Sequence, residues 1–150
     1  MPDSLHHIVL VDDNETTSFL NNRLLARLGA AERVSTISRA DEAFAQIWGE
    51  AEGEGKEEGN GKGGAAPAPD LLFVDLKMPG VSGFDFLKLY AALPAPVQER
   101  TVVAVLTTSL HAADTARVAA HPNVEYLTKP LTEEKMAMLL ARRFAGRMAA

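Results

Sequence analysis

The amino-acid sequence predicts an α/β protein in which helices cover both faces of a parallel sheet. Short runs of apolar and β-branched residues recur along the 150-residue chain, and stretches with apolar residues at helical spacing lie between them. Most of these runs are apolar at nearly every position, as expected for strands that are buried on both sides. Regular alternation of strand and helix patterns is typical of a parallel sheet.

The strands are predicted from five such runs. We expect them at residues 8–11, 33–37, 71–74, 101–106 and 124–127. Pro79 and Gly80 follow the third run closely, and both residues interrupt regular structure.

The first two helices are predicted from helical spacing and end signals. The first spans residues 15–28 and ends at Gly29, a residue that favours helix termination. Its inner face carries four leucines, which are Leu20, Leu24, Leu25 and Leu28. The second covers residues 39–48, with Ser38 as the expected N-cap.

Three further helices complete the predicted set of five. The third begins after the cap residue Ser82 and ends near residue 93, before two prolines. The fourth covers residues 112–120. The fifth follows the cap residue Thr132, and its inner stripe consists of Met136, Leu139, Leu140 and Phe144.

Residues 50–69 interrupt this alternation. They contain six glycines and no large apolar side chain, so they cannot bury enough surface to offset the entropy of ordering. We therefore expect one domain over residues 1–150, with a flexible insertion at about 50–69 and no output domain.

Composition excludes several classes of function. The chain has no cysteine, which rules out disulfides, thiolate metal sites and cysteine nucleophiles. The net charge of −5 argues against direct binding of nucleic acid, which needs a basic surface. The absence of a long apolar stretch argues against membrane insertion, and the absence of a secretory signal pattern favours the cytoplasm.

Polar residues recur at the predicted carboxyl ends of four strands. Asp12 and Asp13 follow the first strand, Asp75 the third, Thr107 the fourth and Lys129 the fifth. Ligands of open parallel sheets bind at this edge. Three carboxylates held close together repel one another unless a cation lies among them, which predicts a divalent metal beside a reactive aspartate.

This combination suits phosphoryl transfer to an aspartate. A carboxylate can act as a nucleophile and form aspartyl-phosphate. The transferred group needs positioning and positive charge, which Mg²⁺ held by carboxylates and a lysine can supply.

The same residues resemble the receiver domain of two-component response regulators. The similarity lies in Asp12-Asp13, the run Val74-Asp75-Leu76-Lys77-Met78-Pro79-Gly80, Thr107 and Lys129-Pro130, and it covers the chain apart from residues 50–69. The resemblance implies the flavodoxin-like receiver fold, with five strands in the order 2-1-3-4-5 and five helices on both faces.

The resemblance also implies a role for each position. Asp75 would be the phosphoacceptor, and Mg²⁺ would bind Asp12, Asp13, Asp75 and the backbone carbonyl of Lys77. Thr107 and Lys129 would contact the phosphoryl group, with a cis peptide between Lys129 and Pro130. Tyr126 would move with Thr107 as an aromatic switch, and Gly83 would permit the turn into the third helix.

Two positions would tune the lifetime of the phosphoryl group. These are Lys77, two residues after the acceptor, and Ser109, two after Thr107. We expect the lysine to add positive charge to the acidic pocket. The stretch from Leu106 to Ser109 resembles stand-alone receivers found beside phytochrome-like and other sensor kinases.

The function implied is that of a single-domain response regulator. A sensor histidine kinase would phosphorylate Asp75, and the signal would pass to a downstream protein through the face formed by the fourth helix, the fifth strand and the fifth helix. The resemblance also allows self-dimerisation through that face. The chain would catalyse its own phosphorylation and dephosphorylation without being a multi-turnover enzyme.

Three other interpretations remain open at the level of sequence. The chain could shuttle phosphate to a histidine phosphotransfer protein, or serve as a receiver-like binding module that is not phosphorylated. It could also be a phosphohydrolase similar to haloacid dehalogenases. That class places an acid/base aspartate two residues after the nucleophile, where this chain has Lys77.

Overall fold

The computed structural model describes most of the chain. The described residues are 5–49, 68–78, 80, 82–108, 111–121 and 123–144. The predicted insertion therefore lies outside the described residues from 50 to 67, as does Ser109. Strands and helices alternate along the chain, in the order β1(Leu5–Val11), α1(Glu15–Leu28), β2(Ala31–Ile37), α2(Ala40–Ile47), β3(Leu71–Val74), α3(Gly83–Ala91), α4(Ala95–Arg100), β4(Val102–Thr107), α5(Ala112–Ala119), β5(Val124–Thr128) and α6(Glu133–Arg143).

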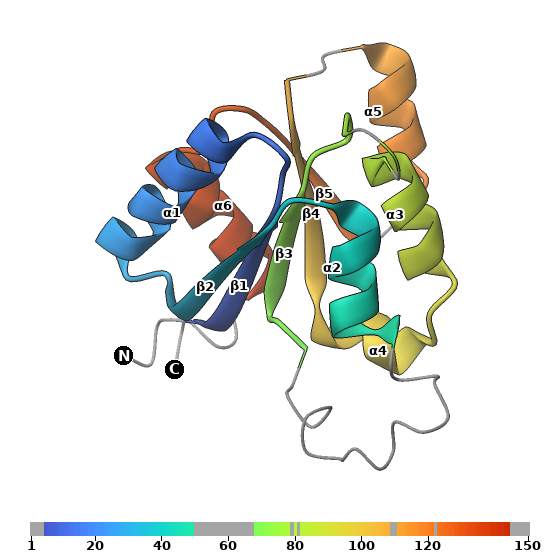
Figure 1. The fold of residues 1–150 in the computed structure, drawn as a ribbon, viewed down its shortest axis with the longest axis horizontal. Coiled ribbons are helices and arrows are strands. Elements are labelled where there is room, and N and C mark those ends of the chain that lie inside the picture. Colours follow the sequence, from blue (N-terminus) through green and yellow to red (C-terminus); the bar gives the residue numbers. More distant parts are fainter. Residues whose placement is uncertain are drawn as a thin grey trace.

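The five strands form one parallel sheet in the order β2-β1-β3-β4-β5. This confirms the predicted fold class and strand order. The carboxyl ends of all five strands lie at the same edge, which is the upper edge of the sheet in Figure 1. Val11 on β1 is level with Val74 on β3, so the residues that follow these two strands emerge side by side.

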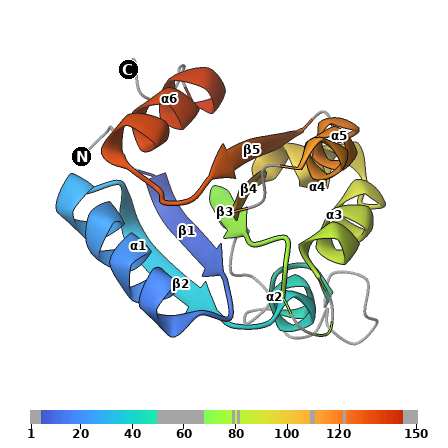
Figure 2. The same ribbon diagram turned by 90° about the horizontal axis from the view of Figure 1, so that it is seen from above.

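Helices cover both faces of the sheet, with α1 and α6 on one face and α2, α3 and α5 on the other (Figure 2). Alternate residues of a strand point to opposite faces, so each strand contributes to two cores. On β1, Ile8 and Leu10 join the core beneath α1 and α6, whereas Val9 and Val11 join the core beneath α2 and α3. This double burial explains why β3 and β4 are nearly all apolar, whereas the edge strand β2 carries several polar residues and has no buried position.

The helix ends match most of the predicted caps. The side chains of Ser82 and Thr132 accept hydrogen bonds from the first turns of α3 and α6. Gly29 ends α1 in the left-handed conformation, with φ of 62°, where a side chain would be strained. The prediction of Ser38 as the N-cap of α2 was wrong, because that helix begins one residue later and its N-cap is Arg39.

Two further details differ from the sequence-based expectation. Six helices occur among the described residues rather than five, because the prolines that end α3 also begin the short helix α4. Leu20 was expected on the inner face of α1, but it is 55% exposed, whereas Leu25 is fully buried. Leu20 has the right spacing, but it lies at the margin of the apolar stripe.

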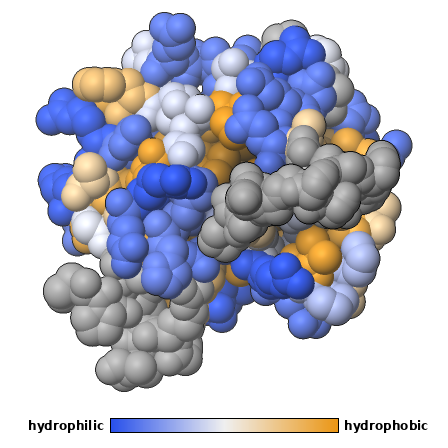
Figure 3. Space-filling view, turned by 60° about the horizontal axis from the view of Figure 1, so that its bottom comes forward, coloured by the Kyte–Doolittle hydropathy of each residue, from blue (hydrophilic) through white to orange (hydrophobic). Residues whose placement is uncertain are grey.

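The end of the sheet opposite the aspartates is held by buried polar contacts. The Tyr90 hydroxyl donates to the carbonyl oxygen of Thr101 at 2.7 Å, and the Thr101 hydroxyl donates to the carbonyl oxygen of Pro69 at 2.7 Å. In an oblique view from this end, hydrophilic residues cover much of the described surface, with smaller hydrophobic areas between them (Figure 3). Within the described ranges, no helix is long and apolar enough to cross a membrane.

Candidate functional site

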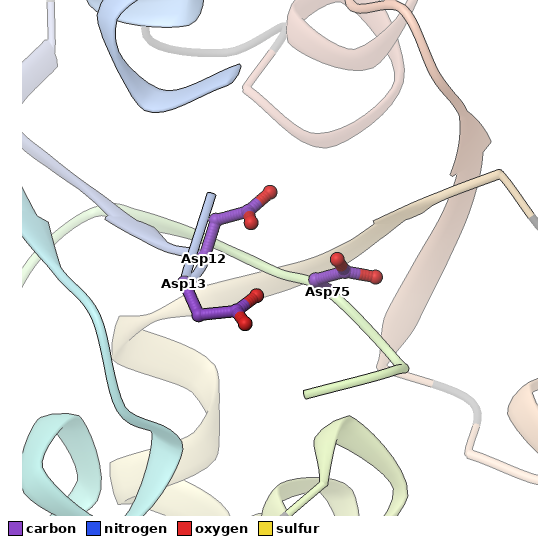
Figure 4. Close-up of side chains that lie close together, drawn as sticks. All are labelled: Asp12, Asp13 and Asp75. Atoms are coloured by element: carbon purple, nitrogen blue, oxygen red, sulfur yellow. The ribbon is translucent and has the colours of Figure 1, made fainter. Parts of the chain in front are cut away.

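The three predicted aspartates lie together at the carboxyl ends of β1 and β3 (Figure 4). Parallel pairing of these two neighbouring strands produces this placement. The backbone N–H of Asp75 donates to the carbonyl oxygen of Val11 at 3.1 Å, which continues the ladder by one residue and sets Asp75 beside Asp12. On the other side, the backbone N–H of Asp12 donates to the carbonyl oxygen of Ile37, at the end of β2.

The three carboxylates are arranged as a set of cation ligands. Asp12, Asp13 and Asp75 each offer an oxygen atom, and these atoms all lie within 4.8 Å of one another. The Asp12 side chain is buried and Asp13 is exposed, so the cluster opens to solvent on one side. Carboxylate oxygens around an open position are the donor set that Mg²⁺ prefers, since this ion keeps several of its water ligands.

Lys129 supplies a positive charge to the same cluster. Its Nζ atom lies 2.8 Å from Oδ2 of Asp12 and 3.2 Å from Oδ2 of Asp75. The peptide bond between Lys129 and Pro130 is cis, as the resemblance implied. The backbone N–H of Lys129 donates to the carbonyl oxygen of Thr107 at 2.8 Å, which fixes the lysine to the end of β4.

The contacts of Lys129 favour the charged form of its ammonium. Burial acts to lower its pKa, but the hydrogen bond to Asp12 and the negative charge of Asp75 outweigh burial. The pKa of Lys129 is therefore raised above its usual value, and the side chain stays positive at physiological pH.

Thr107 and Tyr126 lie on the two strands nearest to Lys129. Thr107 is the last residue of β4 and is buried, level with Thr128 on β5. Tyr126 is half-buried and packs against the core beneath α2, α3 and α5. Tyr126 is therefore linked to Lys129 along β5, and Thr107 is linked to it by the backbone hydrogen bond from Lys129.

Lys77 differs from the expectation in one respect. Its backbone N–H donates to Oδ1 of Asp75 at 3.2 Å, so its main chain contacts this carboxylate. Its ammonium, however, lies 3.5 Å from Oδ2 of Asp114 in the first turn of α5. The charge that was expected to enter the acidic pocket is instead paired with a neighbouring helix.

Gly83 begins α3 at a point of close backbone approach. A Cβ atom at this position would lie 2.3 Å from the carbonyl oxygen of Asp75 and 2.6 Å from Cα of Leu76. These contacts are shorter than atoms can tolerate, so only glycine allows α3 to approach the end of β3 this closely.

Sequence reasoning missed three residues around the site. The backbone N–H of Asn14 donates to Oδ1 of Asp12 at 2.9 Å, and its side chain caps α1. Asp114 pairs with Lys77 from 37 positions away, and no local pattern predicts such a pair. Lys135 contacts the loop that carries Lys129. The feature of the sequence that could have identified Lys135 is its place in the first turn of a predicted helix, where the helix dipole disfavours a cation.

A depression beside the carboxylates gives access to them. Its volume is about 790 Å³, and its walls come from Asp12 and Asp13, from the first turns of α1 and from the loop after β2. Phe19 lines it and is 60% exposed. The side of the cluster formed by Asp12 and Asp13 is therefore open to solvent.

Comparison with known families agrees with this geometry. The chain matches the family described as the response regulator receiver domain over residues 8–141. The chain belongs to this family, whose members are phosphoacceptor modules of two-component signalling.

Individual relatives are similar in the same way. The chain is 29% identical over 126 residues to hybrid signal transduction histidine kinase D of Dictyostelium discoideum, covering 83% of this chain but 7% of the relative. It thus spans a small part of that protein's length. Among solved structures, a two-component response regulator of Cytophaga hutchinsonii has a TM-score of 0.76 and 22% identity, with 95% of this chain and 98% of the other covered. The phosphorylated cyanobacterial phytochrome response regulator RcpA has a TM-score of 0.66 and 27% identity, with 96% and 89% covered.

Proposed function

We propose that this chain is a response regulator that accepts a phosphoryl group on Asp75. The observation that carries the proposal is the contact of one ammonium, that of Lys129, with both Asp12 and Asp75 inside a cluster of three carboxylates. An acid beside a fixed cation and an open cation site is suited to receive a group that carries negative charge.

The carboxylates fit Mg²⁺ by their chemistry. Asp12, Asp13 and Asp75 would hold the ion through their carboxylates, and the resemblance to receiver domains adds the backbone carbonyl of Lys77. When bound, Mg²⁺ neutralises charge on the phosphoryl oxygens and reduces repulsion between the carboxylates.

The transfer itself needs a nucleophile and a fixed donor geometry. A carboxylate oxygen of Asp75 forms a bond to phosphorus while the bond from phosphorus to an imidazole nitrogen of the donor breaks, and the donor histidine keeps that electron pair. Lys129 then exchanges its contact with the Asp75 carboxylate for a contact with the phosphoryl group. The Thr107 hydroxyl donates to another phosphoryl oxygen.

The response to phosphorylation would travel along β4 and β5. When Thr107 moves toward the phosphoryl group, it leaves a space that the half-buried Tyr126 side chain fills. The movement of Tyr126 changes the face made by α5, β5 and α6. A downstream protein or a second copy of the chain would read this face. Lys77 and Ser109 would tune the phosphoryl lifetime.

A sensor histidine kinase is the proposed donor, and the terminal response regulator is the proposed role. The alternative within the same chemistry is a shuttle that passes the group to a histidine phosphotransfer protein. The match to a hybrid histidine kinase bears on this alternative, because the matched segment is only 7% of that relative and is therefore one part of a longer signalling protein.

The proposal is tested by phosphorylation with a small-molecule donor. We expect wild-type protein to gain one phosphoryl group from acetyl phosphate when Mg²⁺ is present, as read by intact mass, and to lose it after chelation and hydrolysis. Asp75→Asn should gain none. Asp85→Asn, which alters a capping aspartate away from the cluster, is the matched control and should be modified like the wild type. Modification of Asp75→Asn at the wild-type rate would refute the assignment.

A further inference from the structure

Lys135 on α6 is placed against the loop that carries Lys129. Its Nζ atom lies 2.6 Å from the carbonyl oxygen of Thr128, 3.2 Å from the Thr128 hydroxyl oxygen and 3.0 Å from the carbonyl oxygen of Pro130. An ammonium has three N–H donors, so these three contacts use its full capacity. Thr128 and Pro130 are the two residues on either side of Lys129.

The position of Lys135 is not explained by the stability of α6. It is the third residue of the helix, where the backbone dipole disfavours a cation. Glu133 and Glu134 occupy the same turn and suit that dipole. A lysine in this turn is therefore placed for its contacts outside the helix, which are those with the loop.

The contacts of Lys135 complement those made from β4. The backbone N–H of Lys129 donates to Thr107, and Lys135 holds the carbonyl groups on both sides. β5 is an edge strand, so no further strand is available to fix its end. The long, flexible side chain of Lys129 reaches Asp12 and Asp75 only if the backbone at its base is fixed.

We propose that Lys135 is a positioning residue for phosphoryl transfer: it orders the Thr128–Pro130 turn and so places the Lys129 ammonium between Asp12 and Asp75. This inference rests on the proposed function. It assigns Lys135 no contact with the phosphoryl group. Its effect must therefore pass through Lys129, and this requirement makes the inference testable.

The first experiment measures loop order without any phosphoryl donor. Lys135→Met keeps most of the aliphatic stem and removes the three donors. We expect amide hydrogen exchange at Lys129, followed by nuclear magnetic resonance, to accelerate by at least about tenfold, since hydrogen bonds from a charged donor are lost. Lys88→Met, at an exposed lysine of α3, is the matched control and should leave this rate unchanged.

The second experiment measures transfer. With acetyl phosphate and saturating Mg²⁺, Lys135→Met should slow phosphorylation of Asp75 about tenfold, because misplacement of a catalytic group by even 1 Å is costly. Mg²⁺ affinity should stay within about twofold, since the carboxylates are unaltered. In a Lys129→Met background, the Lys135 substitution should have no additional effect. Lys135→Gln, a smaller change that keeps a donor, should fall between wild type and Lys135→Met and serves if the latter folds poorly.

The outcomes separate this inference from the proposed function. Wild-type protein that is never phosphorylated would refute the proposed function, while the exchange measurement still decides whether Lys135 orders the loop. Normal phosphorylation of wild type with unchanged exchange and rate in Lys135→Met would refute the inference alone. Two further results would also overturn it: a roughly tenfold loss of phosphorylation rate from Lys135→Met in the Lys129→Met background, or a roughly tenfold loss of Mg²⁺ affinity in Lys135→Met. Either result would show that the substitution disturbs the whole site and does not act through Lys129.

Discussion

Glu125 is a buried acid on β5 that is paired with two arginines from the last turn of α6. Its carboxylate oxygens accept from Arg142 at 2.7 Å and from Arg143. Burial acts to raise the pKa of Glu125, but the hydrogen bonds from Arg143 and Arg142 outweigh it, and the pKa is lowered overall. Because the folded pKa lies below the unfolded one, the pair stabilises the fold at pH values above the unfolded pKa, and this stabilisation is lost as the pH falls through the folded pKa.

Replacing Glu125 should therefore weaken the fold in a pH-dependent way. We expect Glu125→Gln to lower the free energy of unfolding by about 2 kcal/mol at pH 7, since charge-assisted hydrogen bonds are lost. The difference from wild type should shrink as the pH falls below about 4, where the wild-type acid becomes protonated. Urea unfolding at a series of pH values measures it, and a difference that does not vary with pH would contradict this account.

Gly83 provides a second prediction at the scale of one residue. A methyl group at this position would collide with the carbonyl oxygen of Asp75 and with Leu76. We expect Gly83→Ala to lower the free energy of unfolding by about 1–3 kcal/mol and to weaken Mg²⁺ binding, because the backbone at Asp75 and Leu76 would be displaced. Gly29→Ala is the control: its left-handed backbone is strained by a side chain, but nothing lies within 4 Å of the added atom. Both substitutions should destabilise the protein in thermal unfolding, and Mg²⁺ titration should separate them.

At the scale of elements, α5 contacts the segment after β3 through an ion pair and contacts α3 through a cation–π interaction. Lys77 pairs with Asp114, and the guanidinium of Arg117 lies 3.6 Å from the centre of the Phe84 ring. The Lys77 side chain is 60% exposed whereas that of Asp114 is 14% exposed, so the pair is only partly shielded from solvent. The Lys77–Asp114 pair joins α5 to the segment that follows Asp75, and the Arg117–Phe84 contact joins α5 to α3.

The Lys77–Asp114 pair should be weak and sensitive to salt. A double-mutant cycle with Lys77→Met and Asp114→Asn should give a coupling energy of about 0.5 kcal/mol in thermal unfolding at low ionic strength, as for partly exposed pairs. At 1 M salt the coupling should nearly vanish, since charges at the surface are then screened. A coupling that persists in high salt would show that the two side chains interact by packing rather than by charge.

The elements were predictable from sequence wherever one physical cause dominates. All five strands follow from short runs of apolar and β-branched residues, and the caps at Ser82 and Thr132 follow from side chains that can accept hydrogen bonds. α4 was missed because its six residues are too few for a periodic pattern. Leu20 was misplaced because spacing alone does not show where the apolar stripe of a helix ends, which depends on the elements packed against that helix.

The candidate site was predictable for a different reason. Strand ends of a parallel sheet share one edge, so Asp12, Asp13, Asp75 and Lys129 could be brought together without knowledge of coordinates. The contacts of Lys77 and Lys135 could not be predicted in this way. A long lysine side chain reaches different partners according to its rotamer and the local backbone. No sequence pattern identifies Asp114 or the carbonyl groups beside Lys129 as those partners.

At the scale of the whole molecule, the fold holds like charges together at the edge of the sheet. Asp12, Asp13 and Asp75 have oxygens within 4.8 Å of one another, and Lys129 neutralises part of their charge by contacting Asp12 and Asp75. Asp13 remains outside those two contacts. Without a further cation, its charge opposes folding, because ionised carboxylates this close repel one another.

Asp13→Asn should therefore have opposite effects with and without Mg²⁺. In chelator the variant should unfold at the wild-type temperature or above it, since a repulsive charge is gone. At a Mg²⁺ concentration of 100 times the dissociation constant, wild type should gain about 2.7 kcal/mol, a rise on the order of 8 °C in the unfolding temperature. Asp13→Asn should gain much less, so the order of the two proteins reverses. Glu134→Gln removes the same charge from an exposed position on α6 and should respond to Mg²⁺ like wild type. Equal Mg²⁺ responses in all three proteins would show that Asp13 does not contribute to the cation site.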